Sequence, residues 1–207
     1  MNLPNKLSLL RMILVPIFMI VLLLPASVLP MWLSALIGAV IFIAASVTDC
    51  LDGKIARKYN LITDFGKLID PLADKFMVIG ALVMLLYRAQ SYRALFMLVL
   101  TVVVFRELAV TAMRLITATK SGVAVPANIL GKIKTVTQIV FVVAALIEPL
   151  LYPAVDAVTA QVLPLTVWAQ LANILPLTVA SGLVMLVFTV WSGMNYIVAL
   201  WKYIETK

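Results

Sequence analysis

The chain has 207 residues, of which 64% are hydrophobic and 12% are charged. A soluble domain cannot bury that much apolar surface, so the composition excludes a soluble globular protein and predicts an all-α membrane protein, organised as one domain over residues 1–207. The net charge is +7, but the basic residues flank apolar runs, which argues against a nucleic-acid partner and indicates membrane topology, lipid headgroups or an anionic substrate.

Six apolar segments are long enough to cross a bilayer, which requires about 20 helical residues. In chain order they cover residues 7–28, 32–57, 69–87, 93–118, 131–152 and 177–201. No small-residue cleavage site follows the first segment, so we expect a retained helix rather than a signal peptide. The connection 153–176 is punctuated by prolines but remains apolar. It is predicted to be an interfacial helix, with a re-entrant segment as the alternative.

The basic residues predict the orientation of these helices. Of the 16 lysines and arginines, only Arg88 and Arg93 fall on the side opposite the N-terminus. Basic residues accumulate on the cytoplasmic side of membrane proteins, so both termini are predicted to lie in the cytoplasm.

Four aspartates gather where the second segment ends and the third begins. Asp49 and Asp52 are three residues apart and face the same way on a helix, and Asp70 and Asp74 are one turn apart. A charge within a bilayer costs about 3 kcal/mol or more, so four acids placed together need a compensating partner. Converging carboxylates suit Mg²⁺ or Mn²⁺, and two such ions would balance four negative charges. The chain contains no histidine, so any base chemistry falls to a carboxylate.

The link between these two segments also carries local signals. Pro71 is typical of a first helical turn, so the third helix is expected to begin near residue 69. Gly66 would then lie in the link, where its flexible backbone helps one helix fold back on the other. Asp64 is predicted to be a solvated turn or cap residue of the same link.

Small residues continue the face of Asp49 and Asp52. Gly53 and Ala56 have almost no side chain and leave a slot where a ligand can approach the backbone. Arg57 lies at the membrane edge, where its planar fork can reach a phosphate. The alternative is a purely structural one, in which buried ion pairs neutralise the aspartates through Lys54, Arg57, Lys67 and Lys75.

The spacing Asp49-x2-Asp52-Gly53-x2-Ala56-Arg57-x8-Gly66-x3-Asp70-x3-Asp74 resembles, at every fixed position, the signature of the CDP-alcohol phosphotransferase family. This resemblance implies six transmembrane helices, usually a homodimer, and transfer of a group from a CDP-linked donor to an acceptor hydroxyl with release of CMP. It implies that one ion is held by Asp49, Asp52 and Asp70, and the other by Asp49, Asp70 and Asp74. Asp74 would be the catalytic base. The CDP donor would be bound by Asp52, Gly53, Ala56 and Arg57.

A second, basic cluster bears on the acceptor. Arg106 and Arg114 share one broad face of the fourth helix, and Arg106 lies deep in an apolar segment, where it needs an anionic partner. Glu107 is its nearest candidate. Two lysines open the fifth helix, where a helix N-terminus adds to an anion site. We therefore predict a pocket for an acceptor phosphate, formed by Arg106, Arg114, Lys132 and Lys134.

Three further stretches resemble one bacterial subfamily of this family: residues 2–11, 106–108 and 128–135. This likeness implies CDP-diacylglycerol as donor, sn-glycerol 3-phosphate as acceptor, and a bacterial inner membrane. In the first stretch, Asn5, Ser8 and Arg11 are expected either to contact the donor headgroup or to serve helix entry. Inositol phosphate and phosphatidylglycerol are alternative acceptors. A divalent-cation transporter is the alternative from a different class, because intramembrane acids can also line an ion path.

Overall fold

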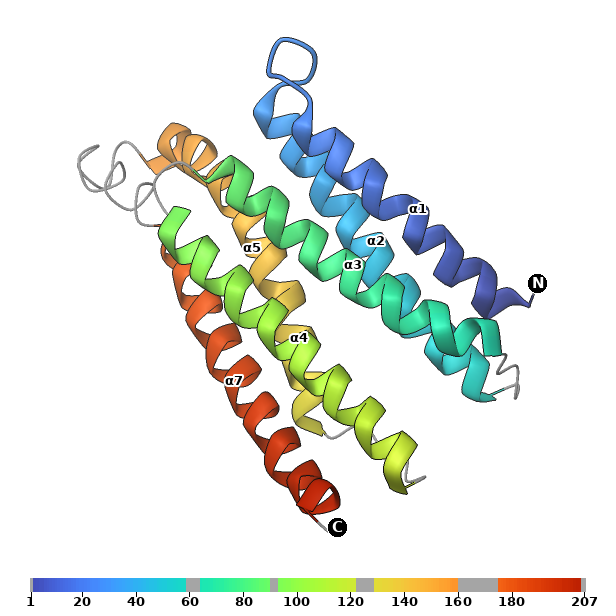
Figure 1. Ribbon diagram of the computed structural model, residues 1–207. Helices are drawn as coiled ribbons and strands as arrows, with labels where there is room; N and C mark the ends of the chain where they lie inside the picture. The colour runs from blue at the N-terminus through green and yellow to red at the C-terminus, as the bar shows by residue number, and fades with distance from the viewer. Residues whose placement is uncertain (1, 59–63, 90–92, 122–128, 160–174, 206–207) are drawn as a thin grey trace.

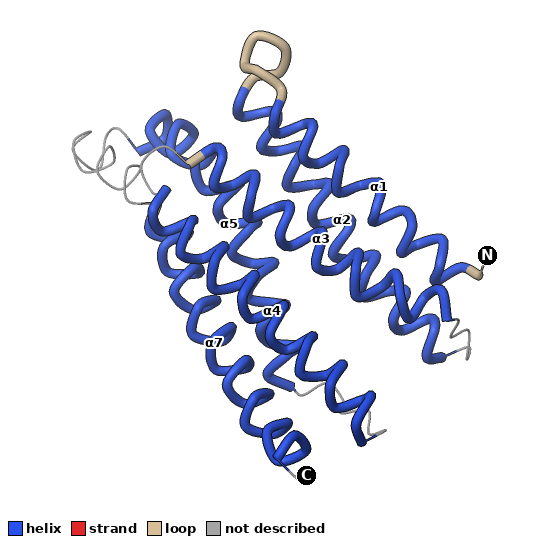
Figure 2. The backbone as a smooth tube through the Cα atoms, in the orientation of Figure 1, coloured by secondary structure: helices blue, strands red, loops and turns tan. Residues whose placement is uncertain are grey.

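The computed structural model describes residues 2–58, 64–89, 93–121, 129–159 and 175–205. Within these ranges the side chains of residues 3, 4, 50, 52–58, 64, 65, 67, 68, 118–121, 152–159 and 202–205 are outside the description. The described backbone is helical apart from short turns (Figure 2). The predicted all-α class is therefore confirmed for this part of the chain.

Six long helices cover the described residues: α1 (Leu3–Leu23), α2 (Met31–Lys58), α3 (Asp64–Arg88), α4 (Arg93–Ser121), α5 (Ile129–Thr159) and α7 (Pro176–Glu205). They run alternately up and down, so both ends of the chain lie at the same end of the bundle (Figure 1). Among the described helices, five are long and apolar enough to cross a membrane, and α3 is not one of them. The first half of α3 carries charged residues, which interrupt its apolar run. The chain is therefore a multi-pass membrane protein.

Three helix boundaries differ from the predicted ones by five residues or more. Helix α1 ends at Leu23 rather than at residue 28, because Pro25 disfavours a helical conformation at the residue before it, and a turn follows. Helix α3 begins at Asp64, so Gly66 and Pro71 lie inside the helix and not in a link or a first turn. The link between α2 and α3 is thus shorter than the position of Pro71 predicted.

The third difference is at the C-terminal end of α5. Helix α5 continues through Thr159, past the predicted end at residue 152. Pro153 follows the predicted end, but a proline removes only one backbone hydrogen bond. Where water is scarce, the remaining helical hydrogen bonds still favour continuing the helix. The rest of the predicted connection falls mainly on residues 160–174, which lie outside the described residues, so its interfacial or re-entrant character stays a prediction.

The bundle consists of two three-helix groups. Helix α1 packs mainly against α2 and α3, and α7 packs mainly against α4 and α5. Contacts of α2 with α5, and of α3 with α4 and α5, join the groups. One buried core runs through all six helices and includes Phe18, Phe42, Met77, Val103, Phe141 and Met185. The first group carries the aspartates and the second carries most of the basic cluster, so the seam between them brings the two together.

Close helix packing depends on small residues at a few positions. A Cβ atom on Gly182 of α7 would lie 2.9 Å from the Phe141 ring of α5, so this ring packs directly against the α7 backbone.

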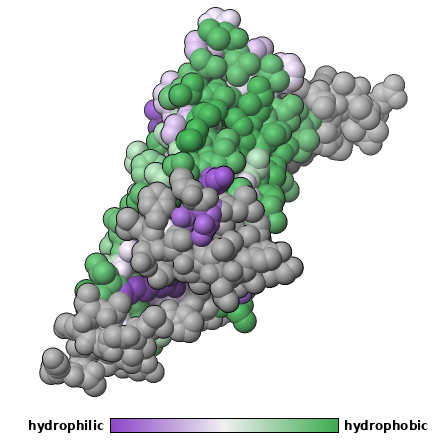
Figure 3. All heavy atoms as spheres, turned by 90° about the vertical axis from the view of Figure 1, so that its right-hand side faces the viewer, coloured by the Kyte–Doolittle hydropathy of each residue, from purple (hydrophilic) through white to green (hydrophobic). Residues whose placement is uncertain are grey.

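The outer surface is apolar: large exposed hydrophobic side chains occur on every described helix. In Figure 3 the described residues in the upper part of one face are mostly apolar, and the largest hydrophilic patches lie near the middle of the face and below it. This distribution suits a surface that contacts lipid chains.

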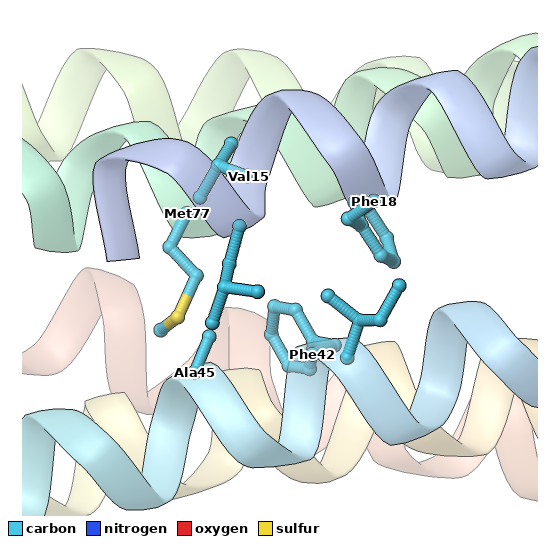
Figure 4. Close-up of a pocket in the computed structure, with 7 residues that line it drawn as sticks. Val15, Phe18, Phe42, Ala45 and Met77 are labelled. Carbon is cyan, nitrogen blue, oxygen red and sulfur yellow. The ribbon is translucent and has the colours of Figure 1, made fainter. Parts of the chain in front are cut away.

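A small apolar pocket of about 10 Å³ lies between α1, α2 and α3 (Figure 4). Val15 and Phe18 line it from α1, Phe42 and Ala45 from α2, and Met77 from α3. Val15 and Ala45 lie one turn deeper than Arg11 and Asp49. The charged residues at this end of the bundle therefore lie next to an apolar layer of the core.

Candidate active site

The described aspartates of the predicted metal site lie on α2 and α3, at the end of the bundle that holds both chain ends. The guanidinium of Arg11 donates to Oδ1 of Asp49, and the hydroxyl of Ser8 donates to Oδ1 of Asp70. Ser8 and Arg11 are three residues apart on α1, and both are fully buried. Helix α1 therefore fixes two of the acids, one on each neighbouring helix.

Asp74 occupies the seam between the two helix groups. Its charge interacts with Asp49 and Arg11 from the first group, and with Glu107 and Lys134 from the second. Its Oδ1 is buried and has no hydrogen-bond partner among the described residues. An unpaired buried carboxylate oxygen is costly, so a site that retains one is a candidate for ligand or proton binding.

The donor half of the predicted site lies outside the described side chains. The backbone of Asp52, Gly53, Ala56 and Arg57 forms the last turns of α2, but the side chains fall outside the description. The roles predicted for them stay predictions.

The purely structural alternative can be tested at one lysine. Lys75 donates to the hydroxyl of Thr111 over 2.7 Å and not to an aspartate, whereas Asp49 has Arg11 as its partner. The side chains of Lys54, Arg57 and Lys67 lie outside the described part of the chain. Among the described side chains, the positive charges that act on these acids come from Arg11 of α1 and Lys134 of α5.

Glu107 is the centre of the basic cluster. Its Oε1 accepts from Nζ of Lys134 and from Nη1 of Arg106, the latter over 3.1 Å. Arg106 therefore pairs with Glu107, its nearest candidate in the sequence. Arg106 also donates through Nη2 to Ser192 Oγ on α7, over 3.0 Å. One buried acid thus holds an arginine of α4 and a lysine of α5 side by side.

The other two predicted phosphate ligands behave differently. Arg114 donates through Nη2 to the hydroxyl of Tyr196 over 2.7 Å, and makes no ion pair with a described residue. Lys132 is exposed and likewise forms no ion pair within the described ranges. Direct contacts therefore join Arg106, Lys134 and Glu107, and Arg114 is linked to them through α7.

The aspartates fit a hard divalent cation in their chemistry. They offer only oxygen donors, which Mg²⁺ and Mn²⁺ prefer, and Asp74 supplies a buried oxygen whose desolvation a cation would offset. Among the side chains that the structure describes, no three acidic or cysteine residues lie close enough together to form a metal site. Asp52, the fourth predicted ligand, lies outside those side chains.

Sequence reasoning missed several of these contacts. It considered Ser8 and Arg11 only for the donor headgroup or helix entry, and it did not consider Ser192 and Tyr196 at all. A signal for the first two exists, since polar residues on one face of a largely apolar helix each need a polar partner inside the protein. For Ser192 and Tyr196 the i, i+4 spacing is suggestive, but the spacing does not identify which helix they face.

Comparisons with known proteins place the chain among lipid-synthesising enzymes. The family model for CDP-alcohol phosphatidyltransferase matches residues 1–201. A Bacillus subtilis (strain 168) protein named CDP-diacylglycerol–glycerol-3-phosphate 3-phosphatidyltransferase is 41% identical over 219 aligned residues, covering 100% of this chain and 98% of that protein. A protein of the same name from Salmonella typhimurium (strain LT2) is 33% identical, over 96% and 94% of the two chains. One from Rickettsia bellii is 38% identical, over 66% and 70%.

Proposed function

Because this chain belongs to the CDP-alcohol phosphatidyltransferase family, we propose that it transfers the phosphatidyl group of CDP-diacylglycerol to sn-glycerol 3-phosphate, giving phosphatidylglycerol phosphate and CMP. Relatives with this named activity match 96–100% of the chain. The structural observation that carries the proposal is the position of Asp74, whose carboxylate interacts with the negative charge of Asp49 and with the positive charge of Lys134. The proposed base is thus close to both the aspartates and the basic cluster.

The reaction forms one bond and breaks another at the same phosphorus atom. The C1 hydroxyl of glycerol 3-phosphate attacks the β-phosphorus of the donor, its proton passes to Asp74, and the bond to the CMP oxygen breaks. Asp49, Asp52, Asp70 and Asp74 would hold two Mg²⁺ or Mn²⁺ ions. When bound, these ions would withdraw charge from the diphosphate and make CMP a better leaving group. No covalent enzyme intermediate is needed.

The remaining residues bind the substrates. Gly53 and Ala56 leave room for the donor headgroup beside Asp52, and Arg57 reaches its diphosphate. The acceptor phosphate is bound by Arg106, Arg114, Lys132 and Lys134. Glu107 cancels only one of these positive charges, so the cluster keeps a net attraction for a dianion.

The cellular setting is part of the proposal. We infer a single-domain, six-span protein of the bacterial inner membrane, active as a homodimer, with the site and both termini on the cytoplasmic side. Both chain ends do lie at the site end of the bundle (Figure 1). CDP-diacylglycerol would enter sideways from the bilayer, and glycerol 3-phosphate would enter from the cytosol.

Product analysis tests the proposal directly. Purified protein is incubated with CDP-diacylglycerol, Mg²⁺ or Mn²⁺, and equal amounts of glycerol 3-phosphate, inositol phosphate and phosphatidylglycerol, and the lipids are identified by mass spectrometry. We expect phosphatidylglycerol phosphate and an equal amount of CMP, both lost on chelation of the metal. A different lipid product would show that the enzyme uses another of the three acceptors. Absence of CMP release together with nucleotide-independent Mn²⁺ uptake into liposomes would favour the transporter alternative.

A further inference from the structure

Helix α7 presents two polar side chains to the arginines of α4. Ser192 and Tyr196 are four residues apart and therefore share one face of the helix. Both are almost completely buried, with exposed fractions of 0% and 4%. Neither carries a charge, so each can direct an arginine without neutralising it.

The ring of Tyr196 lies close to both guanidinium groups. The central carbon of Arg114 lies 4.7 Å from the ring centroid, and that of Arg106 lies 5.8 Å from it. Both distances fall within the range of cation–π attraction, about 6 Å. The Tyr196 hydroxyl also accepts the 2.7 Å hydrogen bond from Arg114. Through one side chain, α7 restrains the direction of both arginines.

The α7 backbone passes close to the stem of Arg106. A Cβ atom on Gly193 would lie 3.1 Å from Arg106 Cγ, and the neighbouring Ser192 accepts from the Arg106 guanidinium over 3.0 Å. The Arg106 side chain is therefore held both along its aliphatic part and at its guanidinium group.

The charges in this cluster do not balance. Glu107 faces both Arg106 and Lys134, while Arg114 forms no ion pair with any residue that the structure describes. Lys134 also interacts with the charge of Asp74, so Arg114 is the one arginine of this cluster whose charge no described carboxylate pairs with. A guanidinium that is oriented but not neutralised is suited to bind an anion from outside the protein.

We propose that Tyr196 is a positioning residue for the acceptor phosphate. Its ring and hydroxyl hold Arg114 beside Arg106, so that both guanidinium groups meet one phosphate dianion, and Ser192 assists at Arg106. The benefit is preorganisation, because a free arginine loses side-chain entropy when it binds, whereas a restrained one has already lost it. This inference rests on the proposed function, since it assumes an acceptor that carries a phosphate.

Tyr196 also has a packing role that the experiment must separate. It forms a small buried cluster with Val110, Leu200 and Met113. Tyr196→Phe keeps the ring in this cluster and removes only the hydroxyl, whereas Tyr196→Leu removes the ring as well. Tyr87 provides the matched control, because it is an exposed tyrosine near the far end of α3, and Tyr87→Phe deletes a hydroxyl away from the site.

The test measures steady-state kinetics of the full-length enzyme in lipid nanodiscs, with donor and acceptor varied separately. For Tyr196→Phe we expect the KM for glycerol 3-phosphate to rise about 10-fold, as loss of a hydrogen bond to a charged group predicts. The kcat, the KM for CDP-diacylglycerol and the thermal midpoint should stay within about twofold or a few degrees of wild type. Tyr196→Leu should raise the acceptor KM further, and Tyr87→Phe should leave it unchanged.

Two further variants test whether Tyr196 acts through Arg114. Arg114→Lys removes the fork that the hydroxyl and ring hold, so adding Tyr196→Phe to it should raise the acceptor KM no further. The inference is overturned if the effects of the two substitutions multiply, if Tyr196→Phe leaves the acceptor KM unchanged, or if it raises the KM values of both substrates equally while lowering the thermal midpoint.

Phosphate binding keeps this test separate from the proposed function. The apparent Kd for inorganic phosphate is obtained from the rise in thermal midpoint with phosphate concentration. If wild-type protein releases no CMP with glycerol 3-phosphate, the proposed function fails, and the phosphate titration alone decides the inference. Weaker phosphate binding by Tyr196→Phe than by Tyr87→Phe then supports it, and equal binding by the two variants overturns it.

Discussion

Replacing Glu107 with glutamine should destabilise the protein, because Arg106 and Lys134 would remain buried without their carboxylate partner. Glu107 and Lys134 are 8% and 5% exposed, and a single oxygen of Glu107 accepts from both Lys134 and Arg106. Glutamine preserves the shape and one acceptor oxygen but supplies no charge. Removing one member of a buried ion pair typically costs about 3–5 kcal/mol. In a membrane the polar groups of the unfolded chain also find partners, which reduces the net cost of losing an ion pair. We therefore expect a loss of about 3 kcal/mol, at the lower end of this range.

A second substitution tests the origin of this loss. In Glu107→Gln with Lys134→Met, only Arg106 is left without its carboxylate, so about half of the lost stability should return. Lys134→Met alone should cost about 1 kcal/mol, because Glu107 keeps its 3.1 Å contact with Arg106.

The assay is reversible unfolding in mixed lipid–detergent micelles, followed by circular dichroism as the fraction of denaturing detergent rises. A loss of about 3 kcal/mol lowers the folding equilibrium constant by roughly 100-fold. The reasoning is refuted if Glu107→Gln unfolds within about 0.5 kcal/mol of wild type. It is equally refuted if the double variant is no more stable than Glu107→Gln.

Three other substitutions probe the site and the core. Asp74→Asn should abolish CMP release while CDP-diacylglycerol still binds in an equilibrium assay; near-normal turnover would remove Asp74 from the role of base. Ser8→Ala removes the hydroxyl that donates to Asp70 and should weaken Mn²⁺ binding about 10-fold by paramagnetic resonance titration; unchanged affinity would mean that Ser8 does not support a metal ligand. Gln138→Met should leave stability unchanged or higher, because both side-chain polar atoms of Gln138 are buried and have no described partner. A clear loss of stability would show that Gln138 has a partner that the described residues do not include.

The sequence alone determined the class of protein and the outline of its acidic site. A 64% hydrophobic composition requires lipid contact, and in lipid the backbone must satisfy its own hydrogen bonds, so helices follow directly. The face shared by Arg106 and Arg114 follows from the helical repeat, and both arginines lie close to Tyr196. The same repeat predicts a shared face for Asp49 and Asp52, which stays a prediction because the Asp52 side chain lies outside the described residues. Helix ends were less predictable: Pro71 lies inside α3, because a proline signal gives a preference that the surrounding helix can override.

Only the tertiary structure decided which charged groups meet. Arg11 and Asp49 are 38 residues apart, Ser8 and Asp70 are 62 apart, and Arg114 and Tyr196 are 82 apart. Each pairing depends on the rotation and axial register of two helices. That register is set by packing over the whole core, as where the Phe141 ring lies against Gly182. Helical periodicity reveals the face on which a side chain lies, but a single sequence does not contain the register that places one face against another.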